Sequence, residues 1–184
     1  RQFVYRTEVG ILPHFRGNNV SMRLMSREIT KAYIASGFRK SYFLATPIHP
    51  NPYCVAYNSG VKLFPSPDRE TPTRVLSIMD KLSEVLNIAK VGVHSRFEKK
   101  VGWIVSESAE RRSRVAQRTD IASRFYLRQN PEYYNGNGMM ILVPVDPLQG
   151  LRVLGTFLKR MVRKRIQRPA PVGGQNKTIL PVEG

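Results

Sequence analysis

The sequence has few of the residues that build disulfides and metal centres. Its 184 residues contain one cysteine, Cys54, which excludes an internal disulfide and a four-cysteine zinc site. The three histidines, His14, His49 and His94, do not have the spacing of metal ligands, and separate structural or surface roles are the simpler interpretation. We therefore expect no metal, and a single cysteine is typical of a reducing compartment such as the cytoplasm.

Long apolar runs are also missing from the sequence. No stretch approaches the roughly 20 apolar residues of a membrane-spanning helix, and the first residues do not have the pattern of a signal peptide. Arg1 is not a start methionine, so we expect a processed or truncated chain. A hydrophobic content of 41% is that of a folded protein and excludes a fully disordered chain.

Acidic residues are scarce relative to basic ones. Thirty lysines and arginines against thirteen acidic residues give a formal net charge of +17. Six of the basic residues lie within residues 159–168, and 17 − 6 leaves +11, so the excess is spread along the chain. Such a field attracts nucleic acid, anionic membranes, acidic proteins and polyphosphate cofactors, and charge alone does not choose among them.

The first part of the chain has the periodicity of a strand–helix–strand unit. Helical spacing over residues 20–36 follows a strand that Pro13 ends, and Gly37 has the position of a residue just past the end of the helix. Strands are predicted over residues 3–12, 41–46 and 61–64. Residues 53–58 fit either a short helix or a strand. Short connections around one helix predict parallel pairing and an α/β fold.

The second part of the chain alternates helices and strands in the same way. We predict an amphipathic helix over 74–87, a strand over 99–107, a helix or solvated loop over 108–118, a helix capped by Thr119 and ending at 130, and a buried strand over 139–145. These elements suggest five regions: a first half (1–65), a linker (66–73), a second α/β half (74–148), a basic amphipathic helix (149–168) and an extended tail (169–184).

The turn between the first strand and the first helix carries a recognisable motif. Its first half consists of Leu12, Pro13, Phe15, Arg16 and Gly17, and Asn19 and Ser21 follow. This segment resembles the acyl-CoA-binding turn of the GNAT superfamily of N-acetyltransferases, in which a strand ends at a proline and a glycine-containing turn leads into a pyrophosphate-binding helix. Asn19 and Ser21 stand where the family has glycine and a small residue.

A second segment strengthens the resemblance, which covers about residues 3–65. The stretch "NPYCVAYNSGVKLF" is similar to a family motif near the pantetheine arm of the cofactor, with Asn51 and Cys54 in the asparagine and alanine positions. Tyr57 falls one residue early, and Asn58 occupies the position of the family's tyrosine. The opening strand and helices of the family are not seen ahead of this segment.

The resemblance implies a GNAT-like mixed sheet with flanking helices, to which a basic C-terminal helical extension is added. It implies acetyl-CoA or a longer acyl-CoA as cofactor, held by Ile11, Leu12, Arg16, Gly17, Asn18, Asn19, Val20, Ser21 and Asn51. Acyl transfer needs a base for the amine and an acid for the departing thiolate, and Glu8 and Tyr57 are the candidates. The simpler interpretation is a surface carboxylate for Glu8 and a core aromatic for Tyr57.

Two functions of different classes therefore stay open. One is an acyltransferase that moves an acyl group from acyl-CoA to an amine. The other is a non-catalytic, degenerate GNAT-fold module that binds nucleic acid or anionic membrane through its basic surface. The residues that would hold such an anionic partner are Lys159, Arg160, Arg163, Lys164, Arg165 and Arg168. The same helix could instead dock on the domain with its charges in solvent. We expect a cytoplasmic protein, peripheral to membrane or nucleic acid if that helix binds one of them.

Overall fold

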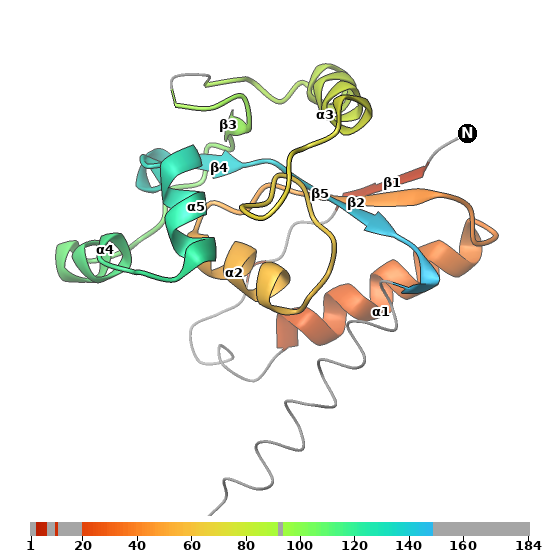
Figure 1. Ribbon diagram of the computed structural model, residues 1–184, viewed down its shortest axis with the longest axis horizontal. Coiled ribbons are helices and arrows are strands. Elements are labelled where there is room, and N and C mark those ends of the chain that lie inside the picture. Colours follow the sequence, from red (N-terminus) through yellow and green to blue (C-terminus); the bar gives the residue numbers. More distant parts are fainter. Residues whose placement is uncertain (1–2, 7–9, 11–19, 92–93, 149–184) are drawn as a thin grey trace, which may run out of the picture.

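A three-stranded mixed sheet lies at the centre of the molecule (Figure 1). This computed structural model describes residues 3–6, 10, 20–91 and 94–148. The strands are β1 (Phe3–Arg6), β2 (Ser41–Ala45) and β5 (Ile141–Val145), in the order β1-β2-β5. β1 runs parallel to β2, and β5 runs antiparallel to β2. The protein is therefore a mixed α/β fold.

Helix α1 (Val20–Ala35) connects the two parallel strands, as the sequence predicts. Its half-buried positions include Met25, Ile29 and Ala32, which follow one helical stripe, and the hydroxyl of Tyr5 on β1 donates to the Ala32 carbonyl at 2.8 Å. Gly37, just past the end of the helix, has a φ of 67°, which glycine adopts without steric cost.

Helices cover both faces of the sheet (Figure 1). Alternate residues of a strand point to opposite faces, so Leu142 and Ile141 enter different cores. On one face, α3 (Thr73–Val85) contributes to a cluster of Tyr42, Leu44, Phe64, Val75, Met79, Met140 and Leu142. On the other, α2 (Pro50–Asn58) and α5 (Ile121–Gln129) contribute to a cluster of Tyr53, Leu63, Val115, Ala122, Tyr126, Tyr133, Met139 and Ile141.

A small antiparallel ribbon extends the structure beyond the central sheet. It pairs β3 (Glu98–Lys100) with β4 (Asn137–Met139), which follows a short 3-10 helix, η2 (Tyr133–Asn135). A Cβ atom at Gly138 would lie 2.8–2.9 Å from atoms of Val101 and Thr46, so glycine is needed where the ribbon meets the segment after β2. Helix α4 (Ala109–Ala116) follows β3 and precedes α5 in the chain.

Three predicted strands were wrong in extent. The predicted 3–12 strand is β1 over Phe3–Arg6, and Gly10 is not in a strand. Residues 61–64 do not form a strand; Phe64 alone makes a bridge to Leu142, since Pro65 follows and has no N–H to continue the ladder. The predicted 99–107 strand ends at Lys100, because Gly102 turns the chain with a φ of 83°.

Other elements match the sequence patterns more closely. Helix α3 confirms the amphipathic helix predicted over 74–87, and α4 forms in the segment where a helix or a loop was open. Residues 53–58 belong to helix α2, which resolves the alternative between helix and strand. The predicted cap of α5 was one residue early, because Asp120 and not Thr119 accepts from the Ser123 amide. The predicted 139–145 strand divides into β4 and β5 at Met140.

The halves predicted on either side of residues 66–73 share one sheet. β5, which comes from the range 74–148, pairs with β2, which comes from the range 1–65. The basic helix predicted over 149–168 and the tail predicted over 169–184 lie outside the described residues. Among the helices of the described ranges, none combines the length and the apolar character that crossing a membrane requires.

Candidate functional site

The carboxyl ends of β1 and β2 mark the edge of the sheet where a ligand is most readily held. Because these strands are parallel, both end at the same edge. The chain leaves β2 through residues 46–49 into α2, and it returns from β1 as α1 at Val20. In open α/β sheets ligands bind in the crevice outside the carboxyl ends of the strands. The side chains around the start of α2 are therefore the candidate site.

The first turn of α2 has almost no free backbone donors. Of the four amides that lack intrahelical partners, those of Pro50 and Pro52 have no hydrogen. The third, the N–H of Asn51, donates to Nδ1 of His49 at 3.0 Å. Only the N–H of His49 remains, so this helix start cannot cradle a phosphate through a row of backbone amides in the usual way.

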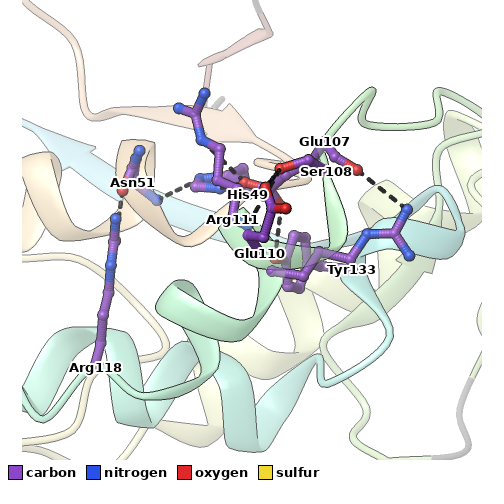
Figure 2. A network of polar contacts seen from close by, with 9 residues as sticks. His49, Asn51, Glu107, Ser108, Glu110, Arg111, Arg118 and Tyr133 are labelled. Atoms are coloured by element: carbon purple, nitrogen blue, oxygen red, sulfur yellow. Dashed lines mark hydrogen bonds and ion pairs between the residues drawn. The ribbon is translucent and has the colours of Figure 1, made fainter.

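A buried carboxylate, that of Glu107, organises the surrounding side chains (Figure 2). Its Oε1 atom accepts from Nε2 of His49 at 3.3 Å and forms an ion pair with Nε of Arg111 at 3.2 Å. Its Oε2 atom accepts from the hydroxyl of Tyr133 at 2.8 Å. The Glu107 side chain is only 2% exposed. One carboxylate thus joins the start of α2, helix α4 and η2.

His49 uses both of its ring nitrogens in this network. Nδ1 accepts the Asn51 amide, so the proton of the neutral ring lies on Nε2, which donates to Glu107. Burial lowers the pKa of His49, which outweighs the opposite effect of the Glu107 charge. Burial, followed by the hydrogen bond to Glu107, raises the pKa of Tyr133 to about 12. The network therefore holds these groups in fixed protonation states and positions α2.

Asn51 and Arg118 carry the network to the surface (Figure 2). Nη1 of Arg118, which follows α4, donates to Oδ1 of Asn51 at 2.5 Å. Asn51 is exposed and Arg118 is half-buried. Because Oδ1 of Asn51 accepts from Arg118, the side-chain NH₂ group of Asn51 is the group that can donate to a ligand. The exposed end of the site thus offers an amide donor beside a guanidinium.

Cys54 lies one turn after Asn51 and packs α2 onto α5. Its Sγ is 3.2 Å from Oγ of Ser123 and 4.0 Å from Oδ1 of Asp120. Burial raises the pKa of the Cys54 thiol, which keeps it protonated at neutral pH. A protonated, half-buried thiol with a hydroxyl partner has a packing role and is not a nucleophile.

Tyr57, the predicted acid, and Asn51, a predicted cofactor-binding residue, are not brought together. Tyr57 is half-buried against the core cluster of Tyr53, with the two rings stacked at 6.5 Å. It is six residues from Asn51, which at 3.6 residues per turn puts the two on different sides of α2. Asn58, by contrast, is exposed and lies about one turn beyond Cys54, on the Asn51 side.

Most of the predicted cofactor site lies outside the described residues. This applies to Glu8, Ile11, Leu12, Arg16, Gly17, Asn18 and Asn19, and to the basic residues Lys159, Arg160, Arg163, Lys164, Arg165 and Arg168. Val20 and Ser21 are the first two residues of α1, whose first turn contains no acidic residue. Of the predicted cofactor residues, Asn51 is the one whose side-chain contacts are described.

The sequence did not single out Glu107, Tyr133 or Arg118. They are 58, 26 and 67 residues from their partners in the chain, and no local motif links such separations. The run "HPNP" did carry a signal, because proline is favoured in the first turn of a helix and the residue before it is a natural cap.

Comparison with known proteins finds no match to this chain among protein-family models, curated sequences or solved structures. Within the described ranges, no three side chains of His, Cys, Asp or Glu are grouped as a metal site would require. The function must therefore be argued from the residues themselves.

We predict that Glu107→Ala lowers the free energy of unfolding by about 3 kcal/mol. Removing one partner of a buried charged network leaves the remaining donors, such as those of His49 and Tyr133, without an acceptor. Urea denaturation measures the change. The matched control is Glu110→Ala, because Glu110 is exposed in the first turn of α4, three residues after Glu107, and a surface substitution changes stability by only about 0.5 kcal/mol. Equal effects of the two substitutions would contradict the central role of Glu107.

We also predict a pH dependence of stability that His49 causes. Because burial lowers its pKa in the folded state, the unfolded chain binds the proton more readily. Stability present above the ordinary histidine pKa of about 6.5 is then lost as the pH falls through the folded pKa. His49→Asn keeps a residue that caps α2 but does not titrate, so this loss should disappear.

Urea denaturation at pH steps between about 7.5 and 5 tests this, since histidines titrate there. His94→Asn, which removes an exposed histidine elsewhere, should keep the decline of the unmodified protein. If His49→Asn retains the whole decline, the buried neutral state of His49 is wrong.

Proposed function

We propose that this chain binds acyl-CoA across the carboxyl edge of β1 and β2 and transfers the acyl group to an amine. The observation that carries the proposal is the parallel β1–α1–β2 unit, in which α1 begins at Val20, within the motif segment that ends at Ser21. This topology supports the strand–turn–helix arrangement that the GNAT-like motif requires. The shape of the turn itself lies outside the described residues.

The start of α1 is suited to the phosphates of the cofactor. The first amides of a helix lack intrahelical partners, and the helix dipole favours an anion there. The first turn of α1 has no acidic residue that would oppose an anion. Arg23 and Arg27 are exposed on the same helix, and Arg16 and Gly17 precede it in the chain.

The start of α2 is suited to the uncharged arm of the cofactor. Its prolines and the His49 cap leave few backbone donors for a phosphate, as described above. The Asn51 amide can instead exchange hydrogen bonds with the amides of a pantetheine arm. The two helix starts thus differ in chemistry in the way that acyl-CoA differs between its two ends.

Transfer of the acyl group requires a base and an acid in addition to binding. We assign the base to Glu8 and the acid to Tyr57, following the GNAT-like motifs. The packing of Tyr57 against Tyr53 means that its hydroxyl must reach the thiolate from the core side of α2. Catalysis is therefore the less supported part of the proposal, and binding is the part to test first.

We predict that Arg16→Ala weakens the binding of acetyl-CoA by about 1.5 to 3 kcal/mol, the value of a hydrogen bond to a charged group. This corresponds to a dissociation constant higher by roughly 10- to 150-fold. Isothermal titration calorimetry with acetyl-CoA and with a long-chain acyl-CoA measures it. Arg74→Ala, which removes an exposed arginine on α3, controls for the loss of charge and should bind like the unmodified protein.

No binding by the intact chain, or equal affinity in the Arg16 and Arg74 variants, would refute the cofactor assignment. Saturating binding of free CoA but not of acetyl-CoA would instead place the thioester outside the site.

A non-catalytic module is the second candidate, and the position of Asn58 favours it. Asn58, not a tyrosine, lies on the Asn51 side of α2, so a thiolate near Asn51 would have no obvious acid. We predict for this alternative that acetyl-CoA binds but that no CoA thiol is released with a panel of primary amines. Thiol release measured with a chromogenic disulfide distinguishes the two, with Tyr57→Phe as the variant that should abolish release if the chain is an enzyme.

A further inference from the structure

The outer face of α5 carries a depression that the acyl-CoA proposal does not use. It has a volume of about 560 Å³ and is lined by Thr119, Ile121, Arg124 and Arg128. Ile121, Arg124 and Arg128 are separated by three and four residues and are all exposed, so they form one stripe along the helix. The opposite stripe, which includes Ala122 and Tyr126, is buried against the core.

The two arginines of this depression are unpaired within the described part of the chain. Neither the Arg124 nor the Arg128 side chain forms a hydrogen bond or ion pair with another described residue, and the same holds for the Arg114 side chain on α4. Elsewhere, exposed arginines do find carboxylates, as Arg69 does with Asp68 and Arg96 with Asp80. The positive charges of Arg124 and Arg128 in the α5 depression thus have no carboxylate partner among the described residues.

The surrounding segment strengthens this charge. Residues 108–130 contain six arginines, no lysine and two acidic residues, Glu110 and Asp120, so 6 − 2 gives a net charge of +4. Asp120 uses Oδ1 to accept from the Ser123 amide at the start of α5. Arginine presents a planar fork of donors that fits a phosphate bidentately, which a lysine does not.

We propose that the outer face of α5 binds nucleic acid through its phosphates, without sequence preference. Arg124 and Arg128 lie one turn apart, about 6 Å along the helix axis, and Arg114 precedes them on α4. Charges repeated along a surface suit a polymer of phosphates better than a single small anion. Ile121 offers an apolar contact to a sugar or base inside the depression.

An anionic membrane is the less suitable partner for this face. A helix that lies on a membrane needs a continuous apolar face toward the lipid. The exposed stripe of α5 holds a single large apolar residue, Ile121, between polar and charged neighbours. The arginines also line a concave depression, which a flat bilayer surface would not fill.

The test measures binding of a fluorescently labelled 20-nucleotide single-stranded RNA and a DNA duplex by anisotropy over a series of salt concentrations. Each phosphate contact to a single strand contributes about 0.7 to the slope of log K against log salt. Arg124→Ala with Arg128→Ala should therefore reduce the slope for RNA by about 1.4. Circular dichroism establishes that the variants remain folded, which their exposed positions favour.

The matched control is Arg74→Ala with Lys81→Ala. This pair removes the same charge from exposed positions on α3, which covers the other face of the sheet. All variants retain residues 149–184, so the basic run there contributes equally to each. We expect the control to keep the slope of the unmodified chain.

Three results would overturn the proposal. The first is no binding of either nucleic acid at about 50 mM salt, where such contacts are strong. The second is an equal loss of slope in the α5 and α3 variants, which would mean that only net charge matters. The third is arginine-dependent binding to vesicles containing phosphatidylserine without binding to RNA or DNA. None of these depends on whether acyl-CoA binds, so this proposal and the proposed function can fail separately.

Discussion

The carboxylate of Glu107 is the contact on which the described site depends. Nearly inaccessible to water, it accepts hydrogen bonds from His49 and Tyr133 and forms an ion pair with Arg111, and so connects the start of α2, helix α4 and η2. An ionised carboxylate in such a place is tolerated only with several donors around it. Those donors in turn fix the His49 tautomer, and the His49 tautomer fixes the cap of α2. The position of Asn51 and Arg118 follows from a charge that neither of them touches.

Two helix starts at one sheet edge have acquired different chemistry through their first residues. α1 begins without acidic residues, and Arg16 and Gly17 precede it in the sequence. α2 begins with two prolines and a histidine cap, which together remove most of its backbone donors. A helix start attracts anions only when its amides are available to them. Under the proposed function, the start of α1 would serve the charged phosphates of the cofactor and the start of α2 its uncharged arm.

The arginines of this protein differ in whether they have a partner, and this difference decides what each positive charge can do. Arg111 and Arg112 are exposed but paired, one with the Glu107 carboxylate and the other with the Glu107 carbonyl and the Tyr134 ring. Arg124 and Arg128 have no such partners among the described residues and lie on an outward stripe. The first pair stabilises the site, while the second pair is available to an external anion. Amino-acid composition counts all four arginines alike and does not distinguish the paired ones from the unpaired ones.

Local patterns determined the helices of this protein, because a helix is stabilised by residues three and four apart. The spacing in 20–36 and 74–87, Gly37 and the apolar stripes were sufficient for α1 and α3. The parallel pairing of β1 and β2 also followed from the length of the connection between them.

The strand ends and the site were decided by the tertiary structure. A strand continues only where a neighbouring strand supplies hydrogen-bond partners. Residues 61–64 therefore form a single bridge, at Phe64, and the strand predicted over 99–107 ends at Lys100. Glu107 is an ordinary acidic residue in sequence and becomes a buried hub only because folding brings His49 and Tyr133 to it. Contacts between residues that far apart have no local signature, because the intervening chain is free to vary without changing them.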